Sequence, residues 1–362
     1  MAQKTISIIG TVGVPGAYGG FETLAENLVR FHEAENIESN LAVYCSSKDK
    51  TERPEQFLTA QLRYVPLDAN GVQSIVYDMI SMLRSVWRRD DTIIILGVSG
   101  ALFLPIIRLV SRMKIITNID GIEWRREKWS GVASKILKWS ERSAVRFSHV
   151  VVTDNKAITE YVNRTYGVKS VTIPYGGDHA LQAKADPSAL EKLPESYALA
   201  LCRIEPENNI DTILQAWTQL SSPLVFVGNW NKSAYGRELK ARFSGHEHIH
   251  ILDPVYEPRA LKAIRSKANL YVHGHSAGGT NPSLVEMMHF NIAVAAHSCE
   301  FNKETTENMA VYFDDPQSLI KTVEALDKSK MNSMGADMGR IARARYTWDT
   351  VAKAYFVLTE TD

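Results

Sequence analysis

Short runs rich in β-branched residues alternate with segments of helical periodicity along the chain, in two series. Such alternation favours a parallel sheet covered by helices on both faces. The first series predicts strands at 5–10, 40–46, 62–67, 91–97, 114–120, 148–154 and 170–176. The second predicts strands at 197–203, 223–229, 248–255, 269–275, 292–298 and 309–314. The sequence therefore predicts an α/β protein with two Rossmann-like, doubly wound domains.

The chain has 362 residues, which suits two domains of ~150 residues each. We expect a first domain at 1–178, a polar, proline-containing linker at 179–196, a second domain at 197–345 and a final helix within 346–362. Ligands of open α/β sheets bind at the carboxyl ends of the strands, and the deepest crevice of a two-domain protein lies between its domains. We therefore expect the two domains to face a central cleft.

Composition excludes several classes of function. The formal net charge is zero, so bulk charge gives no reason to expect a nucleic-acid partner. The three cysteines are far apart and in no ligand spacing, which favours a reduced protein without a cysteine metal site. The start, MAQKTISIIG, leads directly into a strand pattern without an apolar leader. We therefore expect a cytoplasmic location.

The first predicted strand leads into a loop with five glycines, IIGTVGVPGAYGGFETLAENLVRF at residues 8–31. The spacing is not the G-x-G-x-x-G of a dinucleotide fold, and no G-K-[ST] follows. Glycines still let a backbone approach a ligand closely, and a helix beginning near Gly20 has free N–H groups at its start. The loop is either a site for an anion such as a diphosphate or a tight turn without a ligand. Glu22 suits the start of the helix by its charge.

Three features of the second domain are candidates for ligand contact. Arg203 ends the first strand, where it could fork onto phosphate oxygens or pair with a neighbouring glutamate on the surface. The small-residue loop 276–281 precedes a helix, and its N–H groups suit a phosphate. Glu286 lies about one turn into that helix, where a sugar hydroxyl, a capping interaction or solvent could be its partner.

Together these pieces resemble the retaining glycosyltransferases of family 4, which have the GT-B fold. The resemblance spans nearly the whole chain and rests on GVPGAYGGFET (13–23), NIDGIEWRREKW (118–129), VTIPYGGD (171–178), CRIEPENNIDTIL (202–214), GGTNPSLVEMM (278–288) and YTWDTVAKAY (346–355). The opening stretch and DGIEW are most similar to bacterial rhamnosyltransferases of surface-polysaccharide assembly, such as O-antigen or capsule. The resemblance implies transfer of L-rhamnose from dTDP-rhamnose, or of a sugar from a UDP-sugar, to a lipid-linked or growing saccharide acceptor.

The resemblance also implies roles for individual residues. Gly19 and Gly20 would lie against the donor diphosphate and the transferring sugar. Arg203 would hold the diphosphate, and Glu286 would bind the nucleotide ribose. Phosphate and sugar would also contact Gly278, Gly279, Thr280, Asn281, Ser283 and Leu284. The final helix would cross back to the first domain.

The sequence departs from the family pattern at three positions. Gly278 stands where the family has the first glutamate of its motif, which leaves the donor sugar open. Asn208 replaces the usual lysine, so the diphosphate clamp loses one charge, for which Arg265, Lys232 or a basic residue of the first domain could compensate. Asp120 replaces the usual histidine of the first domain.

The expected chemistry needs neither a metal nor a cofactor. Preorganised N–H groups and cations can stabilise the departing diphosphate in a dry site. No two aspartates are two positions apart, so the D-x-D pattern of metal-dependent transferases is absent. No strong nucleophile is evident, and retention then implies front-face attack through an oxocarbenium-like state. We expect Asp120, Arg203 and Glu286 to be catalytic; the alternative for Asp120 is a structural bond to the turn at Gly121.

A basic segment with interleaved tryptophans covers residues 124–147 and contains seven basic and two acidic residues. Trp, Lys and Arg suit the membrane interface. Peripheral contact with the anionic inner face of the plasma membrane, beside a lipid-linked acceptor, would use Trp124, Arg125, Arg126, Lys128 and Trp129. The alternative is a solvated basic helix with its tryptophans in the core.

Other functions also fit the pattern. The donor could be a UDP- or GDP-hexose, and the enzyme could be a GT-B-like UDP-sugar epimerase that needs no acceptor. A non-catalytic nucleotide-sugar-binding protein is compatible with Gly278 and Asn208, because both positions lack a family contact.

Overall fold

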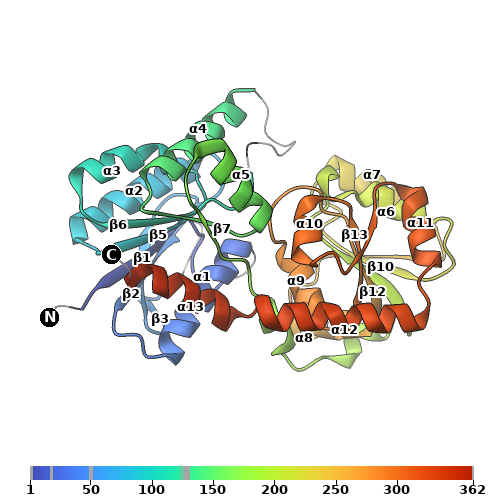
Figure 1. The fold of residues 1–362 in the computed structure, drawn as a ribbon. Helices are drawn as coiled ribbons and strands as arrows, with labels where there is room; N and C mark the ends of the chain where they lie inside the picture. Colours follow the sequence, from blue (N-terminus) through green and yellow to red (C-terminus); the bar gives the residue numbers. More distant parts are fainter. Residues whose placement is uncertain (1–2, 17–18, 49–51, 123, 125–130, 361–362) are drawn as a thin grey trace. The chain divides into compact units, whose positions relative to one another are not determined.

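The computed structural model describes residues 3–16, 19–48, 52–122, 124 and 131–360. The chain divides into two compact units: Met1–Tyr175 together with Trp348–Asp362, and Gly176–Thr347 (Figure 1). Each unit is built on its own, largely parallel sheet. The predicted α/β architecture with two Rossmann-like domains is confirmed.

The first unit is built on an eight-stranded sheet in the order β3-β4-β2-β1-β5-β6-β7-β8. Neighbouring strands are parallel, except that β3 is antiparallel to β4. Every residue of β5, TIIIL, is buried, as expected for a central strand covered on both faces. The strands are β1 (Thr5–Ile9), β2 (Asn40–Ser46), β3 (Gln56–Phe57), β4 (Ala60–Val65), β5 (Thr92–Leu96), β6 (Lys114–Asn118), β7 (Val150–Thr153) and β8 (Val171–Thr172).

The helices that cover this sheet fall into two packed groups. One group is α1 with the C-terminal α13, and the other joins α2, α3 and α4. The bounds are α1 (Gly20–Ala34), α2 (Gln73–Arg88), the 3-10 helix η1 (Ala101–Phe103), α3 (Leu104–Val110), α4 (Gly131–Phe147), α5 (Lys156–Tyr166) and α13 (Trp348–Glu360).

The C-terminal helix belongs to the first unit, as predicted. The rings of Phe356 on α13 and Phe31 on α1 stack with their centroids 5.9 Å apart. The Asn118 side chain, at the end of β6, donates a 2.7 Å hydrogen bond to the Tyr355 hydroxyl. The helix is therefore fixed to both the covering helix and the carboxyl end of the sheet.

The second unit has a parallel sheet of six strands in the order β11-β10-β9-β12-β13-β14. One core cluster includes Trp217, Phe226, Trp230 and Phe313. The strands are β9 (Tyr197–Leu201), β10 (Leu224–Val227), β11 (Ile249–Leu252), β12 (Ala268–His273), β13 (Ala293–His297) and β14 (Val311–Phe313). The helices are η3 (Asp178–Leu181), η4 (Pro187–Leu190), η5 (Pro206–Asn208), α6 (Ile210–Trp217), α7 (Ala234–Phe243), α8 (Pro258–Lys267), α9 (Pro282–Met288), α10 (Glu300–Thr305), α11 (Pro316–Glu324) and α12 (Lys328–Arg345).

The stretch predicted as a linker, 179–196, lies inside the second unit. It packs on α8, where the Asp186 N–H donates to the Arg259 carbonyl at 3.0 Å and the Lys262 ammonium donates to the Leu181 carbonyl at 2.6 Å. Its polar residues and two prolines predict a linker, whereas the segment contains η4 and most of η3. These residues do not reveal that the segment covers a helix of the second unit.

Besides the two 3-10 helices η3 and η4 in the predicted linker, three elements were not expected from the sequence pattern: β3, α10 and α12. Of these three, β3 and α10 are short, with two and six residues. The 18-residue α12 contains Gly335 and Gly339, which lower helix propensity. Both glycines pack against Asn291, so tertiary contact stabilises a helix that local sequence does not predict. In the described part of the chain, no helix has the length and apolar character that crossing a bilayer requires.

Asp78 is a buried carboxylic acid on α2. Its Oδ2 accepts a 3.0 Å hydrogen bond from the Gly100 N–H, and its Oδ1 is buried without a hydrogen-bond partner. Burial raises the pKa of Asp78 to about 7, against the smaller, lowering effect of the Gly100 N–H. The folded protein therefore favours the protonated acid.

We expect the wild type to lose stability as the pH rises from about 4 to about 7, because the unfolded chain releases this proton near its ordinary pKa of 3.8 and the folded chain only near 7. Asp78→Asn should remove this loss and be the more stable protein at pH 8, by up to about 4 kcal/mol, because each pKa unit corresponds to about 1.4 kcal/mol. Urea unfolding across this pH range measures the effect, and Asp253→Asn, at an exposed position, is the control. Parallel pH profiles for wild type and Asp78→Asn would contradict the expectation.

Candidate functional site

Two loops at the carboxyl ends of neighbouring strands are bound together in the second unit. One follows β9 and the other follows β12. The Ser276 N–H and hydroxyl both donate to the Glu207 carbonyl, at 3.1 and 2.8 Å, and the Asn209 amide donates to the Gly274 carbonyl at 2.8 Å. A Cβ on Gly274 would lie 2.1 Å from a backbone carbonyl oxygen of the adjacent loop. The close approach therefore requires glycine at that position.

Arg203 follows β9 and presents a side chain that is 42% exposed. Its nearest ion-pair contact is Glu205, at 3.8 Å, so the guanidinium is held only loosely. Asn208, at the family's lysine position, is buried, and its amide donates to the Arg203 carbonyl at 2.7 Å. This residue fixes the backbone of the loop and contributes no charge to the site.

Glu286 is held by an arginine and a histidine. The carboxylate pairs with Arg265 Nη2 of α8 and lies 3.3 Å from His179 Nε2 of η3. The Glu286 and Arg265 side chains are only 12% and 6% exposed. Burial by itself would raise the pKa of Glu286, but Arg265 and His179 outweigh it and keep that pKa below its usual range. The site therefore contains an ionised carboxylate.

This arrangement departs from the sequence analysis in two ways. Arg265, considered there as a substitute clamp for phosphate, is instead the buried partner of Glu286. His179 was not singled out at all, because it falls in the stretch predicted as a linker. No local pattern would have identified it. Gly177 lies directly against the backbone of Glu286, because a Cβ at position 177 would lie 2.7 Å from the Glu286 nitrogen.

In the loop between Ser276 and α9, position 278 has a backbone conformation that only glycine adopts readily. Gly278 has a φ of +107°, and a Cβ there would meet nothing within 4 Å. The position where the resembled family has a glutamate thus has a left-handed backbone here, which disfavours any L side chain. A side chain at position 278 would have room, but the backbone conformation there disfavours one.

The start of α9 is held by side-chain hydrogen bonds. Asn281 Oδ1 accepts from the Ser283 N–H at 3.1 Å and from its hydroxyl at 2.8 Å, and the Tyr271 hydroxyl donates to Ser283 Oγ at 2.9 Å. Thr280 and Leu284 are buried beside them, and Gly279 completes the loop. Tyr271, on β12, is a supporting residue that sequence reasoning missed.

The glycine loop of the first unit is occupied by carboxylates of its own helix. The Val12 N–H donates to Glu22 Oε1 at 3.0 Å, and the Gly16 N–H donates to Glu26 Oε2 at 2.7 Å. Gly19 has a φ of +130°, and a Cβ there would lie 1.9 Å from Glu22 Oε2. An anion beside Gly19 would face this negative charge, which weakens the predicted diphosphate contact and favours a hydroxyl-bearing ligand.

Polar groups also gather at the carboxyl ends of β6 and β7 in the first unit. Asp120 has a left-handed backbone, with φ of +59°, and its N–H donates to Asn118 Oδ1 at 2.8 Å. The Tyr175 ring packs against Gly20, 3.4 Å from where a Cβ would lie. Burial, followed by the charges of Asp120 and Asp154, raises the pKa of the Tyr175 phenol. Asp120 therefore lies in a polar cluster that could contact a sugar.

The predicted membrane residues are only partly described. Lys138 Nζ lies 4.5 Å above the ring of Trp124, and the Ser134 hydroxyl donates to the Trp124 carbonyl at 2.8 Å. Arg125, Arg126, Lys128 and Trp129 lie outside the described residues. Among the described residues, no group of three or more His, Cys, Asp or Glu side chains is arranged to hold a metal ion.

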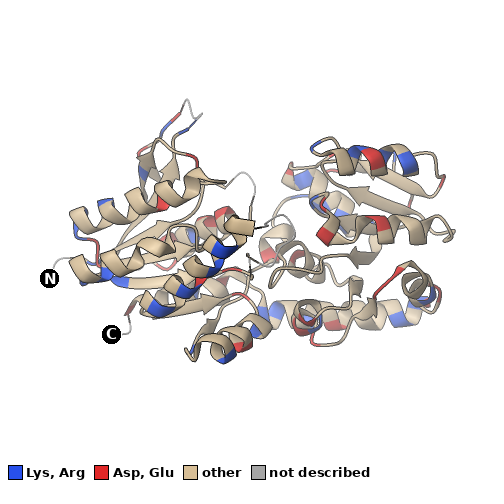
Figure 2. Cartoon of the chain, turned by 90° about the horizontal axis from the view of Figure 1, so that it is seen from above, with Lys and Arg blue, Asp and Glu red and all other residues tan. Residues whose placement is uncertain are grey.

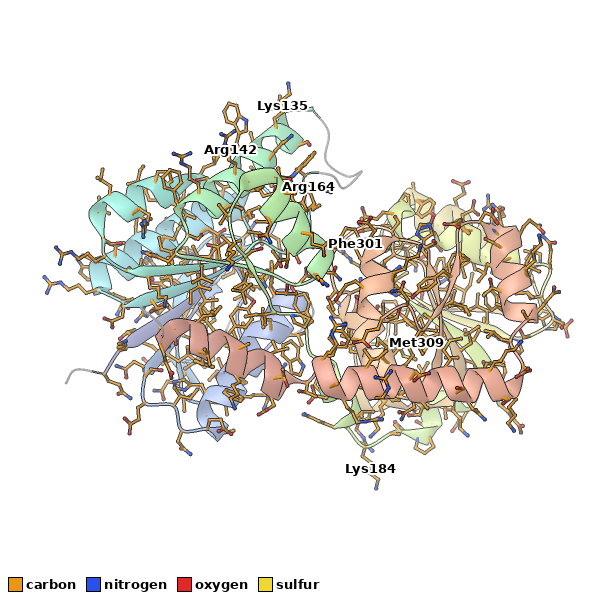
Figure 3. All side chains as sticks on the ribbon, viewed as in Figure 1. Lys135, Arg142, Arg164, Lys184, Phe301 and Met309 are labelled. Atoms are coloured by element: carbon orange, nitrogen blue, oxygen red, sulfur yellow. The ribbon has the colours of Figure 1, made fainter. Side chains whose placement is uncertain are left out.

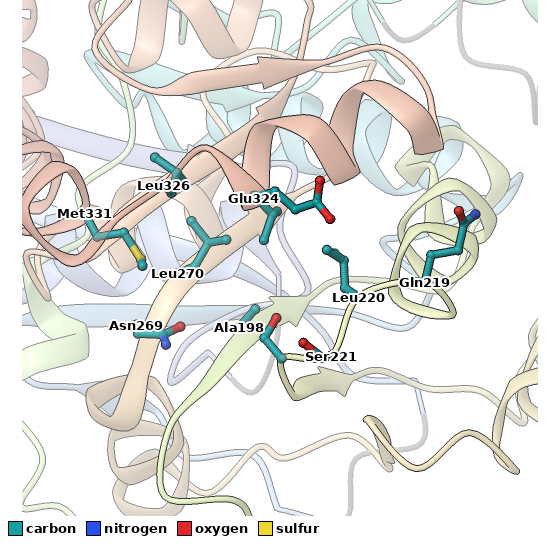
Figure 4. Close-up of a pocket in the computed structure, with 11 residues that line it drawn as sticks. Ala198, Gln219, Leu220, Ser221, Asn269, Leu270, Glu324, Leu326 and Met331 are labelled. Atoms are coloured by element: carbon teal, nitrogen blue, oxygen red, sulfur yellow. The ribbon is translucent and has the colours of Figure 1, made fainter.

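A cavity of about 320 Å³ lies elsewhere in the second unit (Figure 4). Ala198, at the start of β9, and Asn269, at the start of β12, line it together with Leu220, Leu270 and Met331. It is therefore at the amino ends of the strands, whereas ligands of parallel α/β sheets bind at the carboxyl ends. We do not assign it to the functional site.

Comparisons with known proteins agree with this architecture. Residues 182–345 match the family model described as "Glycosyl transferases group 1". Residues 3–178 match the family model described as "Domain of unknown function (DUF1972)". No protein with a curated description gives a match to the sequence.

Several solved structures are similar over almost their whole length. Sucrose-phosphate synthase from Thermosynechococcus elongatus is 13% identical, with a TM-score of 0.80 and 98% of each chain covered. HepE from Anabaena, solved with UDP-glucose, is 15% identical, with a TM-score of 0.72 and coverage of 99% of this chain and 100% of that one. A glycosyltransferase from Rickettsia africae is 11% identical, with a TM-score of 0.73 and coverage of 99% and 98%.

The chain has the GT-B glycosyltransferase fold, as predicted, with two Rossmann-like domains. Residues 182–345, within the second unit, match the glycosyl transferase group 1 model, and this match supports a glycosyltransferase. Membership of family 4 and the resemblance to rhamnosyltransferases stay predictions.

Proposed function

We propose that the protein is a cytoplasmic, retaining, metal-independent glycosyltransferase of bacterial surface-polysaccharide biosynthesis. The first candidate reaction moves L-rhamnose from dTDP-rhamnose to a lipid-linked or growing saccharide acceptor. The observation that carries the proposal is the group 1 match over the unit in which Arg203 and the paired Glu286 lie at the carboxyl ends of the strands.

Donor binding is proposed for these carboxyl-end loops. The loosely held Arg203 supplies a charge for the diphosphate, and the backbone of residues 276–281 supplies further N–H groups. Glu286 accepts hydrogen bonds from the ribose hydroxyls, because a carboxylate has about four acceptor positions and Arg265 and His179 leave some of them open. Arg265 and His179 support this role by keeping the carboxylate ionised.

The transfer step conserves atoms and charge without a covalent enzyme intermediate. The bond between the anomeric carbon and the leaving diphosphate oxygen breaks, and the acceptor oxygen forms its bond on the same face. The acceptor proton passes to the leaving phosphate oxygen. Asp120 is proposed to orient the acceptor hydroxyl, and Gly19 and Gly20 to lie beside the transferring sugar. The absence of a D-x-D pair from the sequence supports transfer without a metal.

A UDP-hexose is the second candidate donor. HepE from Anabaena was solved with UDP, with UDP and glucose, and with UDP-glucose, which supports a uridine nucleotide for a protein of this fold. Gly278 lacks the carboxylate with which the resembled family contacts the sugar. The site residues therefore indicate the sugar of the donor less clearly than its diphosphate and ribose.

A thermal-shift screen of the full chain with dTDP-, UDP- and GDP-sugars tests the proposal. A donor at 100 times its dissociation constant should stabilise the protein by ~2.7 kcal/mol. We expect thymidine and uridine diphosphate sugars to raise the melting temperature most. A shift with guanosine nucleotides alone would refute the rhamnose assignment. Sugar release or epimerisation without any acceptor would favour the epimerase.

A further inference from the structure

The helices α2, α3 and α4 are neighbours in the first unit, and η1 contacts α3 and α4 (Figure 1). Each of these elements carries large apolar side chains that are exposed. Trp87 is 81% exposed, Leu109 is 86% exposed and Trp139 is 69% exposed. The other exposed apolar residues of these helices are Val76, Leu83, Leu102, Ile106, Val110, Val132 and Ile136. We call this set the three-helix surface. So many exposed apolar side chains on packed neighbouring helices indicate an interaction site.

The exposed charges on the same helices are all of one sign. The basic residues exposed there are Arg84, Arg88, Arg108, Lys135, Lys138, Arg142 and Arg146. Lys135 and Arg142 project outward from α4 (Figure 3). Figure 2 shows all the described Lys and Arg residues in blue and all the described Asp and Glu residues in red.

The two carboxylates of these helices are both buried. Asp78 faces Gly100 in the interior, as described above. Glu141 accepts hydrogen bonds from the Tyr161 and Tyr166 hydroxyls, at 2.7 and 2.6 Å. Among the described residues of α2, α3 and α4, no acidic side chain is therefore exposed to oppose an anionic partner.

We propose that the three-helix surface binds the surface of an anionic phospholipid bilayer. Tryptophan and aliphatic side chains enter the interfacial region of a membrane, and Lys and Arg beside them attract anionic headgroups. A protein partner, or a second copy of this chain, would need carboxylates of its own to match seven cations and would meet apolar residues spread over three helices instead of a groove. Charge complementarity thus favours the bilayer.

This inference rests on the proposed function and extends it, because binding to a bilayer would place the enzyme beside a lipid-linked acceptor. It differs from the sequence-based prediction, which used residues 124–129, because α2 and α3 supply much of the surface. Vesicle binding requires no donor sugar, so it can succeed or fail independently of glycosyl transfer.

Co-sedimentation of the full chain with phosphatidylglycerol-containing vesicles and with phosphatidylcholine vesicles is the test. We expect binding to the anionic vesicles that weakens with salt. One variant carries Arg88→Glu, Lys135→Glu and Arg142→Glu, and another carries Trp87→Ser, Leu109→Ser and Trp139→Ser. Each should lower the partition coefficient at least tenfold. The matched control, Lys184→Glu with Lys267→Glu and Lys328→Glu on the second unit, should bind like wild type.

Retention of the nucleotide-induced thermal shift shows that each variant is folded and leaves the proposed function intact. Wild-type protein that stays in the supernatant with anionic vesicles would overturn the inference, as would unchanged binding by both surface variants. If light scattering shows a dimer that the serine variant abolishes, while vesicles bind neither protein, the occupant is a second copy and the bilayer is excluded.

Discussion

Arg265→Ala is expected to lower the free energy of unfolding by about 3 kcal/mol or more, because it leaves the carboxylate of Glu286 buried without its main charge partner. His179 remains, but it pairs with the other carboxylate oxygen. Nucleotide binding should also be lost, because Arg265 no longer holds the Glu286 carboxylate in position. Urea unfolding and titration calorimetry with UDP and dTDP measure the two effects. Arg340→Ala, in an exposed i,i+3 pair, is the control and should cost less than about 1 kcal/mol.

A double replacement separates the structural role of this pair from its binding role. Arg265→Met with Glu286→Leu removes both charges and fills the space with apolar atoms, which is often nearly neutral for stability. We expect the double variant to be more stable than Arg265→Ala and still unable to bind nucleotide. If the double variant binds nucleotide like wild type, Glu286 has a structural role only, and the proposed ribose contact is wrong.

Arg203→Ala should reduce the rate of sugar transfer by about 100-fold or more, the range seen when one preorganised group loses its contact with developing charge. The side chain is 42% exposed and paired only loosely, so the free energy of unfolding should change by less than about 0.5 kcal/mol. Steady-state transfer assays and urea unfolding measure these quantities.

Two further variants define the cause of the Arg203 effect. Arg203→Lys keeps the charge but not the fork geometry, so it should restore only part of the activity. Glu205→Ala removes the neighbour 3.8 Å away and should leave transfer nearly unchanged. Full activity in Arg203→Ala would contradict the proposed contact with the diphosphate and leave Arg203 only its surface ion pair with Glu205.

The fold could be predicted from sequence because its main signal is local. Runs such as TIIIL at 92–96 and YALAL at 197–201 are continuous, apolar and short, as buried parallel strands are. The elements that escaped prediction depend on tertiary contact. α12 carries two glycines that pack on Asn291, and η4 is ordered by α8.

For the candidate site, sequence could predict where its main residues lie in the fold, and their roles stay predictions. Arg203, Glu286 and the loop at 276–281 follow from the rule that parallel strands present their carboxyl ends on one edge. The partners of Glu286 come from η3 and α8, distant in sequence, and no spacing connects them. The glycine loop has a different difficulty: the sequence does not reveal that Glu22 and Glu26 of the following helix accept hydrogen bonds from the Val12 and Gly16 N–H groups.

The most direct measurement is a crystal structure of the full chain with UDP or dTDP bound. We expect the nucleotide on the second unit, with its diphosphate against Arg203 and the 276–281 loop and its ribose hydroxyls on Glu286. A nucleotide bound only to the glycine loop of the first unit, or none at saturating concentration, would contradict this assignment.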